Sequence, residues 1–145
     1  MNKVLGLIVL VLIFLVGGFF LLNNYIYEQK QGDGLSLTSK TWEWEHTLIN
    51  DGRRITPAKA GAFKVTFGED GRFTATTDCN QMGGSYKAED GRLEISDMFS
   101  TKMYCEGSQE STFAQFVGDS TQYHFTDDGK LILGIKFDSG TVTFR

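Results

Sequence analysis

The two cysteines are the residues with the clearest chemistry in this chain of 145 residues. Cys79 and Cys105 are its only cysteines, and neither lies in a Cys-x-x-Cys pair. The sequence therefore lacks the spacing of a zinc site or a thioredoxin-type redox centre. In an exported domain, two such cysteines most simply form one disulfide, and two buried free thiols are the alternative.

Polar and large side chains surround both cysteines and form two candidate interaction loops. These candidate residues are Asp78, Asn80, Thr101, Met103 and Tyr104. One interpretation is that they grip a ligand. The other is that the first loop is a turn, in which the Asp and Asn side chains bond to nearby backbone groups. A disulfide would bring the two loops together, so we expect a binding site, if the domain has one, at this place.

Other reactive side chains lack the partners that catalysis or metal binding requires. His46 and His124 stand alone, so each is predicted to be structural or solvent-facing. Glu43 and Glu45 lie on a predicted exposed strand face, and residues 127–129 are typical of a turn rather than a calcium loop. There is also no glycine-rich phosphate loop and no recognisable Ser/His/Asp set. We therefore expect no catalytic residue, no metal site, no cofactor and no enzymatic activity.

Residues 4–22 contain sixteen hydrophobic residues and three glycines and nothing else. A helix of that length would cover about 28 Å, close to the thickness of the hydrocarbon core of a bilayer. A cleaved signal peptide is the alternative, but no small-x-small cleavage site follows the apolar run. The sequence thus predicts a transmembrane signal anchor at 4–22 and a tether at 23–37.

The flanking charges give a prediction of orientation and exclude one class of partner. Lys3 and the terminal amine precede the apolar run, which favours cytoplasmic residues 1–3 and an extracytoplasmic domain. From residue 31 onward there are twelve Lys/Arg and seventeen Asp/Glu, a net charge of −5, with no basic stripe. Nucleic-acid binding is therefore not expected. The predicted location is the cell membrane, as a single-pass protein.

The remaining residues must position the two loops, and their pattern is that of strands. Hydrophobic residues alternate with polar ones, as in strands with one buried face. The alternating segments are residues 42–48, 63–67, 72–79, 93–95, 123–125, 131–137 and 142–144. Asp-Gly turn signals separate several of them. One helix is predicted from about Ser108 to Gly118, because Phe113, Phe116 and Val117 share a face.

About eight strands and one helix predict a mainly-β fold, a small antiparallel barrel. Trp42 and Trp44 lie on the inward face of the first strand. They are predicted to belong to the core, and the alternative is that they line a pocket for an apolar ligand. Strand and helix faces use most of the apolar residues, so little is left for an exposed apolar docking patch.

Several of these residues together resemble the META domain, the family of the heat-inducible lipoprotein HslJ. The motif residues are Trp42, Trp44, Thr77-Asp78-Cys79-Asn80, Gly83-Gly84, Tyr86, Thr101-x-Met103-x-Cys105, Glu110 and Phe113. The resemblance covers residues 38–145 and implies a lipocalin-like β-barrel with a helix across it. It also implies an exported or membrane-linked protein without an assigned reaction. Unlike HslJ, this chain has no lipidation cysteine, so the apolar run would serve as the anchor.

Three functional hypotheses follow. The first is a non-enzymatic, membrane-anchored module of envelope stress response or envelope interaction. The second is a carrier or sensor of a small apolar ligand held in the barrel near Trp42 and Trp44. The third is an inhibitor of an envelope hydrolase that acts through its loops.

Overall fold

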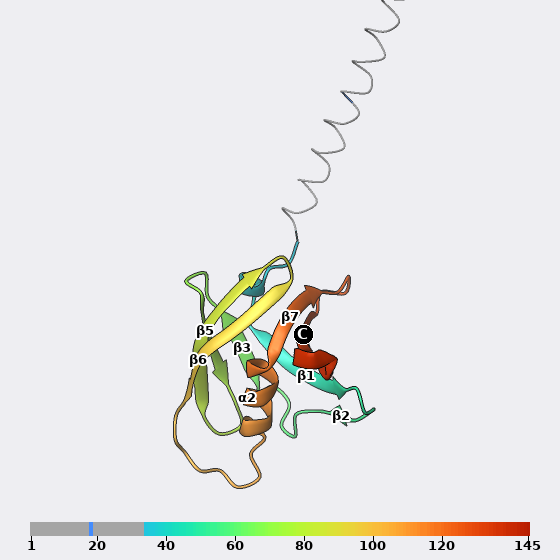
Figure 1. Cartoon of the computed structure of the whole chain (residues 1–145). Coiled ribbons are helices and arrows are strands. Elements are labelled where there is room, and N and C mark those ends of the chain that lie inside the picture. The colour runs from blue at the N-terminus through green and yellow to red at the C-terminus, as the bar shows by residue number, and fades with distance from the viewer. Residues whose placement is uncertain (1–17, 19–33) are drawn as a thin grey trace, which may run out of the picture. The chain divides into compact units, whose positions relative to one another are not determined.

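The computed structural model describes residue 18 and residues 34–145 (Figure 1). The cytoplasmic terminus predicted at 1–3, all of the transmembrane helix predicted at 4–22 except residue 18, and most of the tether at 23–37 lie outside the described residues. None of the helices in the described part has both the length and the apolar character needed to cross a bilayer.

The compact unit spans Ser36–Arg145 and contains nine strands, one α-helix and two short 3₁₀ helices. The strands are β1 (Trp42–Ile49), β2 (Arg54–Ile55), β3 (Lys64–Phe67), β4 (Arg72–Thr76), β5 (Gln81–Glu89), β6 (Arg92–Ser100), β7 (Ser120–Phe125), β8 (Leu131–Ile135) and β9 (Gly140–Phe144). The helices are η1 (Leu37–Ser39), α2 (Glu110–Gly118) and η2 (Lys136–Asp138).

Eight of the strands close into an antiparallel barrel. The strand order runs from β1 through β3 to β9, and β9 pairs again with β1. The two-residue strand β2 adds a short hairpin to the far end of β1. The predicted mainly-β antiparallel barrel with one helix is confirmed.

The ladder between β6 and β7 is much shorter than its neighbours. β5 and β6 pair through seven residue pairs, whereas β6 and β7 pair only through Arg92 and Gln122. Helix α2 lies beside this gap (Figure 1). A Cβ atom at Gly118 would lie 2.9 Å from the sulfur of Met98, so the end of α2 packs closely on β6. We call this gap the seam of the barrel.

Aromatic rings fill the interior. The ring of Phe113, from α2, lies 5.4 Å from Trp44, 5.1 Å from Phe63 and 6.3 Å from Phe144. Trp42 is also fully buried, and its ring stacks on Phe125 at 5.7 Å. These contacts join the helix to strands on both sides of the barrel.

The folded unit begins slightly earlier than the boundary predicted at residue 38. Leu37 is buried, and its carbonyl accepts a 2.7 Å hydrogen bond from the indole nitrogen of Trp42. The end of the predicted tether is therefore part of the domain.

Strand β5 has no alternating pattern because two glycines interrupt it. A Cβ atom at Gly83 would lie 2.7 Å from the ring of Phe99, and one at Gly84 would lie 2.7 Å from the ring of Phe73. The glycines thus leave room for aromatic rings of the neighbouring strands, one on each face of the sheet.

One sequence-based expectation about an apolar residue was wrong. Phe137 was expected to share the inward face of Leu131, Leu133 and Ile135, but β8 ends at Ile135. Phe137 instead adopts φ +58° in η2, with 91 % of its surface exposed. Among the described residues, seven large hydrophobic side chains are exposed. They are Leu35, Leu48, Met98, Phe99, Met103, Tyr104 and Phe137.

Candidate functional site: a disulfide cluster beside the seam

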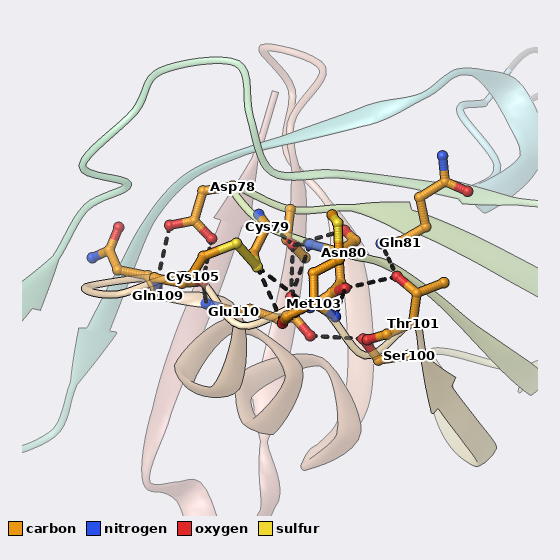
Figure 2. Close-up of a disulfide and its surroundings, with 12 residues drawn as sticks. Asp78, Cys79, Asn80, Gln81, Ser100, Thr101, Met103, Cys105, Gln109 and Glu110 are labelled. Atoms are coloured by element: carbon orange, nitrogen blue, oxygen red, sulfur yellow. Dashed lines mark hydrogen bonds between the residues drawn. A yellow bond between two sulfur atoms is a disulfide. The ribbon is translucent and has the colours of Figure 1, made fainter.

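Cys79 and Cys105 form a disulfide, with their Cα atoms 5.9 Å apart (Figure 2). Cys79 follows β4, because that strand ends at Thr76 and not at residue 79 as the alternation predicted. Cys105 lies in the segment between β6 and α2. We use the term disulfide cluster for residues 77–81, 100–105 and 108–110, which the bond draws together.

Asn80 is the central side chain of the disulfide cluster. It is buried, and its amide nitrogen donates to the carbonyl of Met103 at 3.0 Å. Its amide oxygen accepts from the backbone N–H of Met103 at 2.9 Å and from the hydroxyl of Thr101 at 2.7 Å. One side chain therefore occupies both backbone groups of Met103, as a neighbouring strand would.

Asp78 is distant from helix α2 in the sequence but accepts hydrogen bonds from groups at the start of that helix. Its carboxylate accepts from the Ser108 hydroxyl at 2.6 Å and from the Gln109 backbone N–H at 2.9 Å. The Ser108 oxygen accepts in turn from the N–H of Glu110 at 3.1 Å. A carboxylate at the positive end of a helix is also favoured by the helix dipole. Asp78 therefore acts in the structure as a helix cap.

Glu110 ties the two loops to the helix. One carboxylate oxygen accepts from the Thr77 hydroxyl at 3.1 Å and from the Asn80 N–H at 3.0 Å. The other accepts from the Ser100 hydroxyl at 2.7 Å. Partial burial raises the pKa of Glu110, but these hydrogen bonds outweigh it, and the net pKa lies below the ordinary value of 4.5. An ionised carboxylate with its oxygens already engaged is suited to a structural role rather than to proton transfer.

The same contacts leave two side chains of the loop in solvent. Met103 is 63 % exposed and Tyr104 is 91 % exposed, although the backbone of Met103 is held by Asn80. A shallow surface hollow of about 260 Å³ lies between Tyr104, Met103, Glu110 and Ala114. A fixed backbone with exposed Met and Tyr side chains is a surface suited to protein contact.

The structure brings together all five predicted interaction residues and the two cysteines. The sequence did not single out Thr77, Ser100, Ser108 or Glu110 as site residues, although each bonds within the disulfide cluster. Thr77 and Glu110 were named only as motif residues of the family resemblance. The sequence does not show which backbone or side-chain group each of these polar side chains would bond.

Trp42 and Trp44 lie away from the disulfide cluster, in the packed interior. Both rings are fully buried. The Trp44 indole donates to the hydroxyl of Thr47 at 3.1 Å, and its ring contacts Phe63 at 5.2 Å. Of their two predicted roles, the structure places them in the core.

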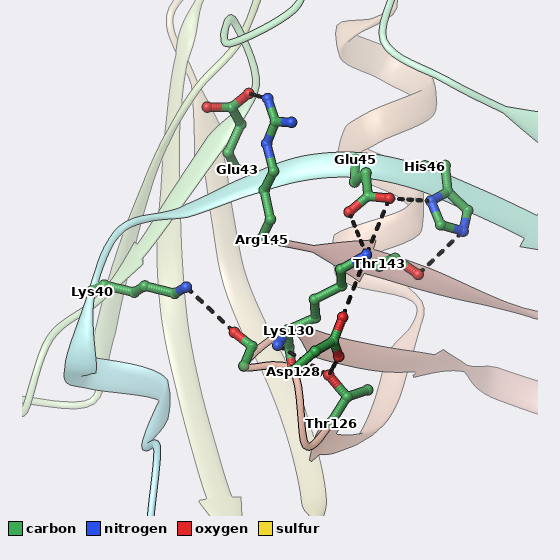
Figure 3. Close-up of polar contacts among 10 residues, drawn as sticks. Lys40, Glu43, Glu45, His46, Thr126, Asp128, Lys130, Thr143 and Arg145 are labelled. Atoms are coloured by element: carbon green, nitrogen blue, oxygen red, sulfur yellow. Dashed lines mark hydrogen bonds and ion pairs between the residues drawn. The ribbon is translucent and has the colours of Figure 1, made fainter.

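A second polar cluster lies on β1, β9 and the turn between β7 and β8 (Figure 3). Lys130 contacts Glu45 at 3.1 Å, and the His46 ring lies 3.5 Å from the same carboxylate and 3.4 Å from the hydroxyl of Thr143. Burial lowers the pKa of His46, as does the charge of Arg54. Glu45 was expected to be solvated, and instead it is half-buried in these contacts. No group of three or more potential metal ligands occurs in the part of the chain that the structure describes.

The barrel and its disulfide cluster define a small β-barrel protein with one covalently fixed loop. The model of the META domain family matches residues 35–144. The chain belongs to the META domain family, as the motif residues predicted. A comparison with curated proteins found no match.

Solved structures share the fold at low sequence identity. The NMR structure of a protein from Burkholderia xenovorans is 22 % identical, with a TM-score of 0.61 over 74 % of this chain and 81 % of that one. The crystal structure of a DUF4847 family protein from Bacteroides vulgatus ATCC 8482 is 19 % identical, with a TM-score of 0.58 over 74 % of this chain and 92 % of that one. At these identities the likeness concerns the fold alone.

Proposed function

We propose that this META-domain protein is a non-enzymatic interaction module, anchored in the cell membrane through residues 4–22, with its domain on the extracytoplasmic side. There it would bind an envelope protein through the loop at residues 101–109 and take part in an envelope stress response. An envelope hydrolase is one class of such a partner.

The observation that carries this proposal is the contrast between the fixed backbone and the exposed side chains of that loop. The disulfide, Asn80 and Glu110 hold the loop, while Met103 and Tyr104 are in solvent. A loop that is already ordered loses little conformational entropy on binding. Aromatic and Met side chains are enriched at the centres of protein interfaces.

The disulfide supports the extracytoplasmic location. Disulfides persist in oxidising compartments and are rare in the cytosol. A fusion of alkaline phosphatase to the C-terminus would test the location, because that enzyme is active only outside the cytoplasm. An active fusion is expected. An inactive fusion that is nevertheless produced at full length would place the domain inside and contradict this part of the proposal.

A photo-crosslinking amino acid at position 104 tests the interaction in intact cells. Position 87 is the matched control, because Lys87 is also exposed but lies on β5 outside the disulfide cluster. We expect a crosslinked envelope protein from position 104 only. The double variant Met103→Ala/Tyr104→Ala should lower the tolerance to heat and envelope-active drugs as much as deletion of the protein. Equal crosslinking from both positions, or a double variant and a deletion strain with normal tolerance, would refute this function.

Packing favours the core role of the tryptophans over a ligand carrier. Trp42, Trp44 and Phe113 contact other rings in the interior, and all three are fully buried. An apolar ligand near these rings would have to displace them.

A further inference from the structure

A groove on the outer face of the barrel combines features that suit one class of ligand. It crosses β3, β4, β5 and the end of β6 and has a volume of about 450 Å³. Its lining includes Lys64, Thr66, Thr74, Gln81, Phe99 and Thr101. We call it the threonine groove.

The strand register arranges these residues in two parallel rows. In one row, Lys64 pairs with Thr76, and Thr76 pairs with Gln81. In the other row, Thr66 pairs with Thr74, and Thr74 pairs with Gly83. Residues directly opposite each other on neighbouring strands project from the same face of a sheet. Neighbouring polar side chains within a row therefore lie about 4.8 Å apart, three of them in the first row and two in the second.

Phe99 completes the second row and gives the groove an aromatic platform. Phe99 pairs with Gly83, and a Cβ atom at Gly83 would lie 2.7 Å from the end of its ring. The ring therefore lies across the glycine, yet 57 % of the Phe99 surface stays exposed. Threonines alone are common on an exposed strand. Aromatic side chains are also common in strands, and a ring placed across from a glycine covers its backbone. More than half of the Phe99 surface nevertheless stays open beside the threonines, so one face of the ring is free to contact a ligand.

Polar groups beside this ring are available to a ligand. Among the described residues, the Gln81 amide, the Thr74 hydroxyl and the Lys64 ammonium make no side-chain hydrogen bond or ion pair within the protein. Glu43, which pairs with Lys64 in the ladder, has its carboxylate bound to Arg145 at 2.6 Å. At the other end of the groove, Thr101 is fixed by its bonds to Asn80 and to the N–H of Gln81 (Figure 2).

We propose that the threonine groove binds a short oligosaccharide. One sugar ring would stack on Phe99, and hydroxyl groups along the oligosaccharide would bond to Gln81, Thr74 and Lys64. A sugar ring has an apolar C–H face and a rim of hydroxyl groups. These two features match the Phe99 ring and the methyl, hydroxyl and amide groups beside it. A nucleic acid is disfavoured by the domain charge of −5. A lipid chain is disfavoured because exposed hydroxyl groups would lose water without gaining partners.

This site goes beyond the proposed function, since it meets the loop at residues 101–109 only at Thr101, does not include Met103 or Tyr104, and does not depend on the side of the membrane. Titration of the ¹⁵N-labelled full chain with chitotetraose and cellotetraose, followed by NMR, tests it. The detergent must be sugar-free, such as lauryldimethylamine oxide, because maltoside or glucoside detergents would compete. We expect amide shifts confined to the residues of the groove, which are Lys64, Thr66, Thr74, Gln81, Gly83, Phe99 and Thr101.

Substitutions distinguish binding at this site from non-specific binding. Phe99→Ala should weaken the affinity roughly tenfold, the loss expected when an aromatic ring can no longer be buried by the ligand. Gln81→Ala provides a second variant that keeps the platform. Phe137→Ala is the matched control, because Phe137 is an equally apolar exposed ring at another place. Met103→Ala/Tyr104→Ala should also bind normally, so loss of the proposed function and loss of this site are distinguishable.

Three results would overturn the proposal: no shift with either saccharide, shifts that map to other strands, or unchanged binding by both Phe99→Ala and Gln81→Ala. Spectra of the variants that match the wild type away from the groove would show that their fold is retained.

Discussion

The barrel has two junctions of very different construction. β1 and β9 pair through five residue pairs, whereas β6 and β7 pair only through Arg92 and Gln122. The segment that joins β6 to β7 contains α2 and half of the disulfide cluster. Where backbone pairing is short, the chain uses a buried helix face, a disulfide and side-chain hydrogen bonds instead. The comparison indicates that the family motif residues in this cluster maintain the seam and fix the adjoining loop.

The largest effect on stability is expected when part of the buried face of α2 is removed from the seam. Phe113→Ala deletes a fully buried ring that contacts Trp44, Phe63 and Phe144. We expect the free energy of unfolding to fall by about 3–5 kcal/mol. Urea denaturation followed by tryptophan fluorescence measures it.

Phe137→Ala is the control for that experiment. Its ring is 91 % exposed, so the change in stability should stay within about 0.5 kcal/mol. Similar losses from both substitutions would show that the helix does not contribute through its buried face.

The second test removes the covalent bond. The double variant Cys79→Ala/Cys105→Ala opens a link between residues 26 apart in the sequence. The free energy of unfolding should fall by about 3 kcal/mol, because the unfolded chain regains the entropy of the opened loop. Chemical reduction of the wild-type protein should give a loss of similar size. A variant as stable as the oxidised protein would mean that the hydrogen bonds alone maintain the cluster.

The third test concerns the charge of Glu110. Glu110→Gln should cost about 1–2 kcal/mol at neutral pH, because hydrogen bonds to a carboxylate are stronger than those to an amide. The pKa of Glu110 is lowered in the folded state, so its stabilising effect is present above pH 4.5 and is lost as the pH falls through the folded-state value. The difference between wild type and variant should therefore shrink in acid. A difference that is constant with pH would show that the charge is not what matters.

The smallest effect is expected at the other junction. Burial and the charge of Arg54 lower the pKa of His46, so below pH 6.5 the unfolded chain takes up a proton that the folded chain does not. Stability should decline modestly from pH 6.5 downward, and His46→Gln should reduce that decline. His124→Gln is the control, because His124 is exposed on β7. An identical pH profile for His46→Gln and the wild type would contradict this assignment.

The sequence predicted those parts of the fold in which one residue pattern determines one structure. Alternation revealed the strands with one buried face, and Asp-Gly pairs marked turns such as that at Gly129, where φ is +80°. β5 was not recognised because Gly83 and Gly84 serve the rings of other strands. Phe137 was misplaced because nothing in the local pattern shows that β8 ends at Ile135.

The location of the site was predictable from the sequence, but the contacts that hold the site together were not. Two cysteines near polar residues indicated where two loops would meet. The roles of Asp78 as a helix cap and of Asn80 as a partner of Met103 depend on contacts between residues more than 20 positions apart. The threonine groove likewise exists only through the register of separate strands, so no local sequence signal could reveal it.

Hydrogen exchange measured with and without the disulfide tests most directly whether the cluster maintains the seam. In the Cys79→Ser/Cys105→Ser variant, we expect faster exchange at the amides of Met103, Gln109 and residues 110–118, with β1, β8 and β9 unchanged. Protection lost equally in β1 and β9, or unchanged protection throughout α2, would contradict the assignment of the cluster to the seam.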